Sequence, residues 1–150
     1  MNCSAQDFLE LSELVLKKGD CFRFRAQGWS MSPFIRNGDL IQVKSVSPLN
    51  LKYGDIIFYH NHRERVIVHR IINKDKVNDS LIFLVKGDSS QGKAEYVYQE
   101  NIVGKVVAIE KRRRTINMEN NLVQLANTCY VRCLPFSKLI MRSLQKLHLL

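Results

Sequence analysis

Short apolar runs separated by turn residues dominate the middle of the chain. Segment 21–27 alternates apolar Phe22 and Phe24 with arginines, which is typical of a half-buried strand. Further short runs rich in Ile, Val and Phe cover 40–46, 55–60, 65–73, 81–86 and 102–109. Turn sequences such as Asn37-Gly38-Asp39 and Asn78-Asp79-Ser80 lie between them. Because no helical pattern interrupts these runs, they predict a mainly β fold, an antiparallel barrel or folded sheet.

The N-terminal end has helical periodicity instead. Ser4 and Asp7 have the spacing of a capping box, and Gly19 offers a natural helix end. Between them, apolar residues recur at helical intervals. They are Phe8, Leu11, Leu14 and Val15. We therefore predict a short amphipathic helix over 4–18.

The C-terminal end predicts a helical tail of two short helices, broken at Pro135. The apolar face of the first comprises Leu122, Leu125, Ala126, Cys129 and Cys133, and that of the second Phe136, Leu139, Ile140, Leu144 and Leu147. These faces can pack against the β-domain or another subunit, while the basic polar face suits a peripheral membrane helix. The predicted division of the chain is an N-terminal helix over 1–19, a β-domain over 20–110 and a basic helical tail over 111–150.

Charge narrows the choice of partners only in part. The 150 residues carry a formal net charge of +9, with a basic run at Lys111–Arg114 and further basic residues in the tail. This surplus fits an anionic membrane surface, a nucleic acid or simply a solvated face. Acidic residues interrupt the first 18 positions, and no uncharged apolar stretch is long enough to span a bilayer. We expect a cytoplasmic protein without signal peptide or membrane span, in peripheral contact with the inner membrane surface through its tail.

The cysteines give no sign of a metal site. Cys3, Cys21, Cys129 and Cys133 are scattered, and no second pair with zinc spacing accompanies the last two. We interpret all four as buried free thiols in a reducing compartment. No metal and no cofactor is predicted.

Two residues stand out for chemistry. Ser30 lies just after the first strand, in Gly28-Trp29-Ser30-Met31-Ser32-Pro33, where a turn can hold a hydroxyl exposed and oriented. His69 lies within an apolar strand, on the face of Ile67 and Ile71, where burial favours the neutral imidazole that a general base requires. Taken separately, each is more often an ordinary turn serine or a hydrogen-bonded core histidine.

Their order among other motifs carries a family resemblance. Five motifs follow one another: the Ser30 segment with a later Gly-Asp, then Tyr53-Gly54-Asp55-Ile56-Ile57-Phe58, Val68-His69-Arg70-Ile71, Lys86-Gly87-Asp88 and Val103-Gly104-Lys105-Val106. Over about 25–109, the chain resembles the type I signal peptidases and the related LexA-like serine peptidases. In LexA-like repressors and most bacterial signal peptidases, the general base is a lysine. Histidine at position 69 resembles the Ser–His branch of the endoplasmic reticulum, archaea and sporulating bacteria.

The resemblance implies a role for each matching residue. Ser30 is the nucleophile, His69 the base and then the acid, and Asp88 orients the imidazole or supports the site. Backbone amides around Gly28 and Ser30 stabilise the oxyanion. The branch usually has a second aspartate several residues after its Lys-Gly-Asp motif, but this chain has none there, which leaves Glu95 as an alternative third member.

The predicted function is a serine endopeptidase that cleaves a precursor or leader peptide through a Ser–His acyl-enzyme. The resemblance implies an extended substrate with small residues before the cut. A first alternative is a weak or inactive peptide-binding module of the same fold, motivated by the missing aspartate. A second is a LexA-like, DNA-associated regulator. The basic run is its only support, and no helix-turn-helix pattern precedes the β-domain, so nucleic acid is an improbable partner.

Overall fold

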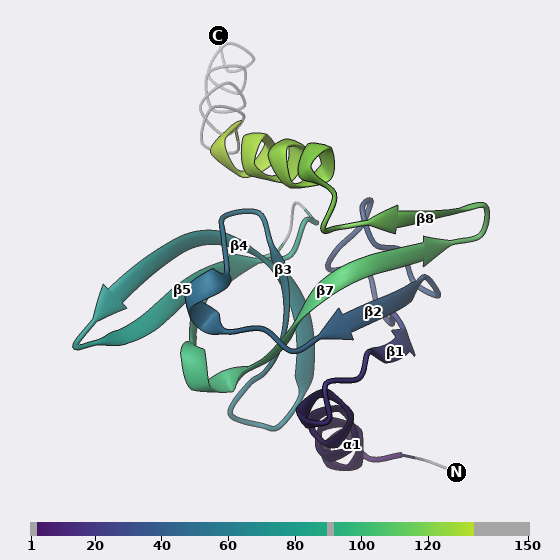
Figure 1. Ribbon diagram of the computed structural model, residues 1–150, viewed down its shortest axis with the longest axis horizontal. Helices are drawn as coiled ribbons and strands as arrows, with labels where there is room; N and C mark the ends of the chain where they lie inside the picture. The colour runs from purple at the N-terminus through teal and green to yellow at the C-terminus, as the bar shows by residue number, and fades with distance from the viewer. Residues whose placement is uncertain (1–2, 90–91, 134–150) are drawn as a thin grey trace, which may run out of the picture.

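The computed structural model describes residues 3–89 and 92–133 and is built around one eight-stranded antiparallel sheet (Figure 1). The strands are β1 (Phe22–Arg25), β2 (Leu40–Lys44), β3 (Ile56–His60), β4 (Val66–Val77), β5 (Ser80–Lys86), β6 (Glu95–Tyr98), β7 (Ile102–Lys111) and β8 (Arg114–Asn117). Their order is β1-β2-β7-β3-β4-β5-β6, and β8 pairs with β7. Among the described residues β1 and β6 do not pair, so the sheet is a half-barrel. The predicted mainly β class is confirmed.

Strand β3 separates the two parts of the hydrophobic core. Its residues Ile56 to Tyr59 are all at most 1% exposed, because this strand is covered on both faces. Strand alternation sends Ile56 and Phe58 into one cluster with β1, β2 and β7 residues. Ile57 and Tyr59 enter a second cluster with residues from β4, β5 and β6. Tyr59 therefore shares a face of the sheet with the alternate residues of β4.

The N-terminal helix forms as predicted. Helix α1 (Ala5–Lys17) follows Ser4, whose side chain and backbone exchange hydrogen bonds with Asp7 in a capping box. Phe8 packs edge-on against Phe22, Phe24 and Phe58 at centroid distances of 5.4 to 6.3 Å. This aromatic group fixes α1 beside β1 at one end of the sheet (Figure 1).

Strands β6 and β8 have no counterpart in the sequence prediction. Each is four residues long, and β6 buries only Val97 while β8 buries none of its residues. Such edge segments carry no apolar run, so their pairing with β5 and β7 decides their structure. The basic run Lys111–Arg114 forms the β7–β8 turn, and Lys111 pairs with Asp39 at 2.7 Å. The sheet thus continues past residue 110 to Asn117.

Residues 121–133 are helical, as predicted, but they pack through a different face. Asn127 and Val131 are the buried side chains, while Leu122 and Leu125 of the predicted apolar face are 76% and 60% exposed. Of the surfaces considered for the apolar face, the β-domain is not the one it meets here, because Asn127 makes the buried contact with Arg70 of the sheet. The second predicted helix, after Pro135, lies outside the described residues.

The interpretation of the cysteines as buried thiols is also wrong. All four are free, but Cys3, Cys129 and Cys133 are exposed and Cys21 is partly buried. Cys129 and Cys133 are exposed because residues 121–133 pack through Asn127 and Val131 instead. Within 3–89 and 92–133, no helix combines the length and apolar character needed to cross a bilayer.

Candidate active site

Ser30 lies in the turn segment that connects β1 to β2. Gly28 adopts a φ of +92°, a backbone conformation that favours glycine, and its amide donates to the side chain of Asn37 at 3.0 Å. The carbonyl of Ser30 accepts a hydrogen bond from the amide of Ser89 at 2.9 Å. The Ser30 residue is exposed, and its backbone is fixed by the hydrogen bond from the segment that follows β5.

Gly87 allows this segment to approach Ser30. A Cβ atom at position 87 would lie 2.4 Å from the carbonyl oxygen of Ser30 and 3.3 Å from Nε2 of His69. The first distance is far below van der Waals contact, so only glycine fits without a shift of the backbone. The glycine of Lys86-Gly87-Asp88 thus brings the backbone of Ser30 and the imidazole of His69 together.

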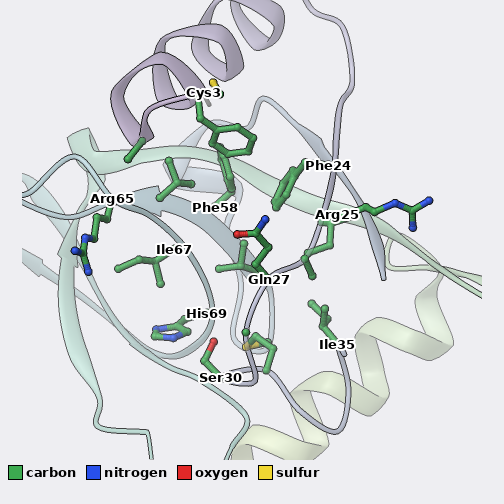
Figure 2. A pocket seen from close by; sticks show the side chains of 18 of the residues that line it. Cys3, Phe24, Arg25, Gln27, Ser30, Ile35, Phe58, Arg65, Ile67 and His69 are labelled. Carbon is green, nitrogen blue, oxygen red and sulfur yellow. The ribbon is translucent and has the colours of Figure 1, made fainter. Parts of the chain in front are cut away.

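His69 faces Ser30 from strand β4. Figure 2 shows the hydroxyl of Ser30 directed toward the imidazole ring, and Nε2 is the ring nitrogen on the side of Gly87, which itself lies against the Ser30 carbonyl. The His69 side chain is 14% exposed. Burial lowers the pKa of His69 below its ordinary value, although the nearby carboxylates of Glu95 and Asp88 act in the opposite direction. A lowered pKa favours the neutral imidazole at neutral pH, which is the form expected from the sequence.

Glu95 and Tyr59 lie on the other side of the same ring. The Nδ1 atom of His69 is 3.0 Å from the hydroxyl of Tyr59 and 3.5 Å from Oε1 of Glu95. The hydroxyl of Tyr59 also donates a hydrogen bond to Oε1 of Glu95. Of the two carboxylates considered as a third member, Glu95 is the one beside His69.

Asp88 is engaged by a different partner, Arg70. Both of its carboxylate oxygens accept from the guanidinium, at 2.8 and 2.7 Å, and both side chains are nearly inaccessible to solvent. Arg70 also donates to the carbonyl of Gly54 and the side chain of Asn127. Its guanidinium also lies over the rings of Phe34 and Tyr130, at 4.8 and 5.4 Å from their centroids. Asp88 thus anchors the backbone on which Gly87 and Ser89 meet Ser30.

A groove of about 800 Å³ opens beside Ser30 and His69. Its walls are the start of α1, the segment 24–31 and the segment 65–69, with Ile35, Ile41 and Phe58 among its apolar lining (Figure 2). Residues Val66 to Val68 pair with β3 on one side, whereas the pairing of β4 with β5 begins only at Arg70. This part of β4 therefore leaves a backbone edge without a partner among the described residues.

The two amides considered for an oxyanion site differ in their availability. The Gly28 amide is occupied by Asn37, as described above. The amide of Ser30 has no hydrogen-bond acceptor in the described part of the chain. Asp39 and Asp55 cap the turns at Arg36 and Lys52, as expected of turn residues, and each also pairs with a lysine. No group of potential metal ligands occurs among residues 3–89 and 92–133.

Three residues of this region were not identified from the sequence: Tyr59, Arg70 and Asn127. A charged residue inside the apolar run of β4 is a usable signal, because a buried guanidinium requires partners. Tyr59 lies in the apolar strand β3, and its sequence neighbours do not distinguish it from a tyrosine that only packs in the core. Asn127 has no signal in the sequence, since its partner is 57 residues away.

Comparison with known proteins gives the class of the molecule. The family model described as Peptidase S24-like matches residues 2–107, well over half of the chain. The chain therefore belongs to the S24-like peptidase family.

Two curated relatives are signal peptidases. The chain is 36% identical over 62 residues to Signal peptidase I W of Bacillus subtilis (strain 168). The aligned segment covers 41% of this chain and 33% of that protein. It is 30% identical over 89 residues to the Signal peptidase complex catalytic subunit SEC11 of Colletotrichum graminicola. This alignment covers 53% of this chain and 52% of that protein. The chain thus aligns with one third and about one half of these two relatives.

Proposed function

We propose that the protein is a serine endopeptidase that cleaves a precursor or leader peptide through a Ser30–His69 dyad. The observation that carries this proposal is the orientation of the Ser30 hydroxyl toward the His69 ring in the wall of a groove (Figure 2). The lowered pKa of His69 adds support, because a neutral imidazole can accept the serine proton. Kinship with signal peptidases supports the choice of a peptide as substrate.

The reaction proceeds in two halves. Oγ of Ser30 attacks the scissile carbonyl carbon while its proton passes to Nε2 of His69, and the oxyanion is stabilised by the amide of Ser30. The imidazolium then protonates the leaving amine, the C–N bond breaks, and an acyl-enzyme remains. Water enters, gives its proton to the same nitrogen and attacks the ester. Collapse of this second intermediate returns the proton to Ser30 and releases the acid.

The substrate lies extended along β4. The backbone edge of Val66 to Val68 is without a strand partner on the groove side among the described residues. An extended peptide can add to such an edge through main-chain hydrogen bonds, while alternate side chains enter the groove. The groove suits peptides with both apolar and polar side chains, because its lining combines apolar residues such as Ile35 and Phe58 with Arg25 and Arg65.

The test compares four point variants with the wild type. Purified proteins are incubated with a synthetic peptide library of mixed composition, and new termini are identified by mass spectrometry. We expect Ser30→Ala and His69→Ala to abolish cleavage. The matched controls Ser32→Ala, in the same turn, and His62→Ala, in the exposed β3–β4 loop, keep the wild-type rate.

Two results contradict the proposal. Cleavage that persists in both Ser30→Ala and His69→Ala excludes the dyad. Peptides that bind the wild type without being cut, over the whole pH range in which His69 is neutral, indicate the peptide-binding module instead. In that case the Ser30→Ala variant binds the same peptides with unchanged affinity.

A further inference from the structure

The third partner of His69 is a tyrosine hydroxyl and not a carboxylate alone. Oε1 of Glu95 is 3.5 Å from Nδ1 of His69, which is longer than a normal N–H···O hydrogen bond. The hydroxyl of Tyr59 is 3.0 Å from the same nitrogen and donates to the same carboxylate oxygen. The Tyr59 hydroxyl therefore contacts both the imidazole and the carboxylate.

The sheet brings these three side chains together. In the β3–β4 register Tyr59 is opposite Ile67, so it is the diagonal neighbour of His69 on one face. Glu95 begins β6 opposite Val85 of β5, two residues before Gly87. Glu95 meets the ring at Nδ1, whereas Gly87 lies against Nε2, so the two residues flank different nitrogens of His69.

We propose that Tyr59 is a positioning residue that sets the tautomer of His69 by linking its Nδ1 atom to Glu95. A phenol has one proton, and in this arrangement it is donated to the carboxylate of Glu95. The phenol oxygen can then only accept toward the ring, so Nδ1 must carry the imidazole proton. Nε2 is left with its lone pair on the side of Ser30. This inference rests on the proposed function only for its kinetic consequence.

The surroundings keep the phenol protonated. Tyr59 is 1% exposed, and burial together with the charge of Glu95 raises the pKa of its hydroxyl. Two further charges act on His69: the carboxylate of Asp88 raises its pKa, and the ammonium group of Lys86 on β5 lowers it. Neither makes a hydrogen bond to Nδ1, so neither replaces the directional hydrogen bond that Nδ1–H donates to the Tyr59 oxygen.

The experiment reads the tautomer directly. Protein with ¹⁵N-labelled histidine is examined by NMR above the titration range of the imidazoles, and the spectrum of His69→Gln identifies the two signals of His69. In the wild type we expect Nδ1 in the protonated range and Nε2 in the unprotonated range. In Tyr59→Phe the two signals should converge as the Nε2–H tautomer becomes populated. Tyr98→Phe, an exposed tyrosine on β6, is the control and leaves the signals in place.

Kinetics provide the second measurement. Tyr59→Phe should lower kcat for peptide cleavage about tenfold to a hundredfold with little change in KM, the loss expected from one positioning hydrogen bond to a charged network. A wild-type Nε2 that is protonated, or signals that do not move in Tyr59→Phe, overturn the inference even if the rate falls. If the signals behave as expected but the wild type cuts no peptide, the proposed function fails while the role of Tyr59 stands.

Discussion

His69 and Arg70 are neighbours on β4, yet their side chains belong to different environments. His69 lines a groove and has as neighbours a hydroxyl, a phenol and a partly exposed carboxylate. Arg70 is 2% exposed and has every donor group directed at a fixed partner or ring. Strand alternation produces this division, because consecutive side chains leave a strand on opposite faces.

The two environments have different consequences. The partners of Arg70 come from four distant segments, including residues 121–133, so this cation connects the sheet to the helix that follows it. The partners of His69 hold one ring in place and leave one nitrogen accessible. Substitutions of Arg70 or its partners should therefore lower stability more than activity, whereas substitutions of His69 or its partners should lower the proposed activity more than stability.

The largest effect is expected from His69→Gln. Loss of the general base should reduce cleavage about a thousandfold, since this kind of catalysis contributes about 10² to 10⁴. The free energy of unfolding should change by only about 1 kcal/mol, because glutamine can occupy a partly open site. Peptide cleavage and urea unfolding on the same preparation measure both. A large loss of stability would contradict the division between the two sides.

Arg70→Met should have the opposite profile. It leaves Asp88 buried without a cation, and breaking a buried ion pair costs about 3–5 kcal/mol. Urea unfolding measures the loss, and the double variant Arg70→Met/Asp88→Leu should recover part of it because the unpaired charge is gone. Asn127→Ala is the milder companion change. A loss for Arg70→Met below about 1 kcal/mol would show that the network does not hold the fold together.

Gly87→Ala alters a residue that lies against both Ser30 and His69 and directly precedes Asp88, the partner of Arg70. The added methyl group would lie 2.4 Å from the carbonyl oxygen of Ser30, so Ser30, the proposed nucleophile, must move. A displacement of about 1 Å can cost about a hundredfold in rate, and we expect kcat to fall by this order. Gly92→Ala is the matched control in the same loop, since its nearest contact would be an ordinary 3.5 Å. Equal rates for both variants would exclude the proposed role of Gly87.

The smallest change is a pH shift in Glu95→Gln. The carboxylate of Glu95 raises the pKa of His69 against the effect of burial, so its removal should lower that pKa further. Because the neutral imidazole is the active form, kcat/KM falls as pH drops through this pKa, and the acidic limb should move to lower pH. Glu100→Gln, an exposed residue of the short helical turn η2 (Gln99–Asn101), should leave the profile in place. A shift toward higher pH would contradict the assignment.

Prediction from the sequence succeeded where a pattern is local. The alternation around Phe22 and the capping box at Ser4 predicted their elements because strand and helix periods are set by nearby residues. It missed β6 and the buried contact of Asn127 in the helix over 121–133. In both cases a distant partner decides the structure, namely β5 for Glu95–Tyr98 and Arg70 for Asn127.

The sequence by itself determined the mainly β class and the family, and it singled out Ser30 and His69 as candidates, because residue types at motif spacing carry that information along the chain. It assigned the supporting role to Asp88, with Glu95 as the alternative third member. Only the tertiary structure distinguishes them: Arg70 occupies Asp88, and the register of β3 through β6 brings Tyr59 and Glu95 to His69. The physical reason is that a hydrogen bond depends on distance and direction in space, and strands far apart in sequence supply both.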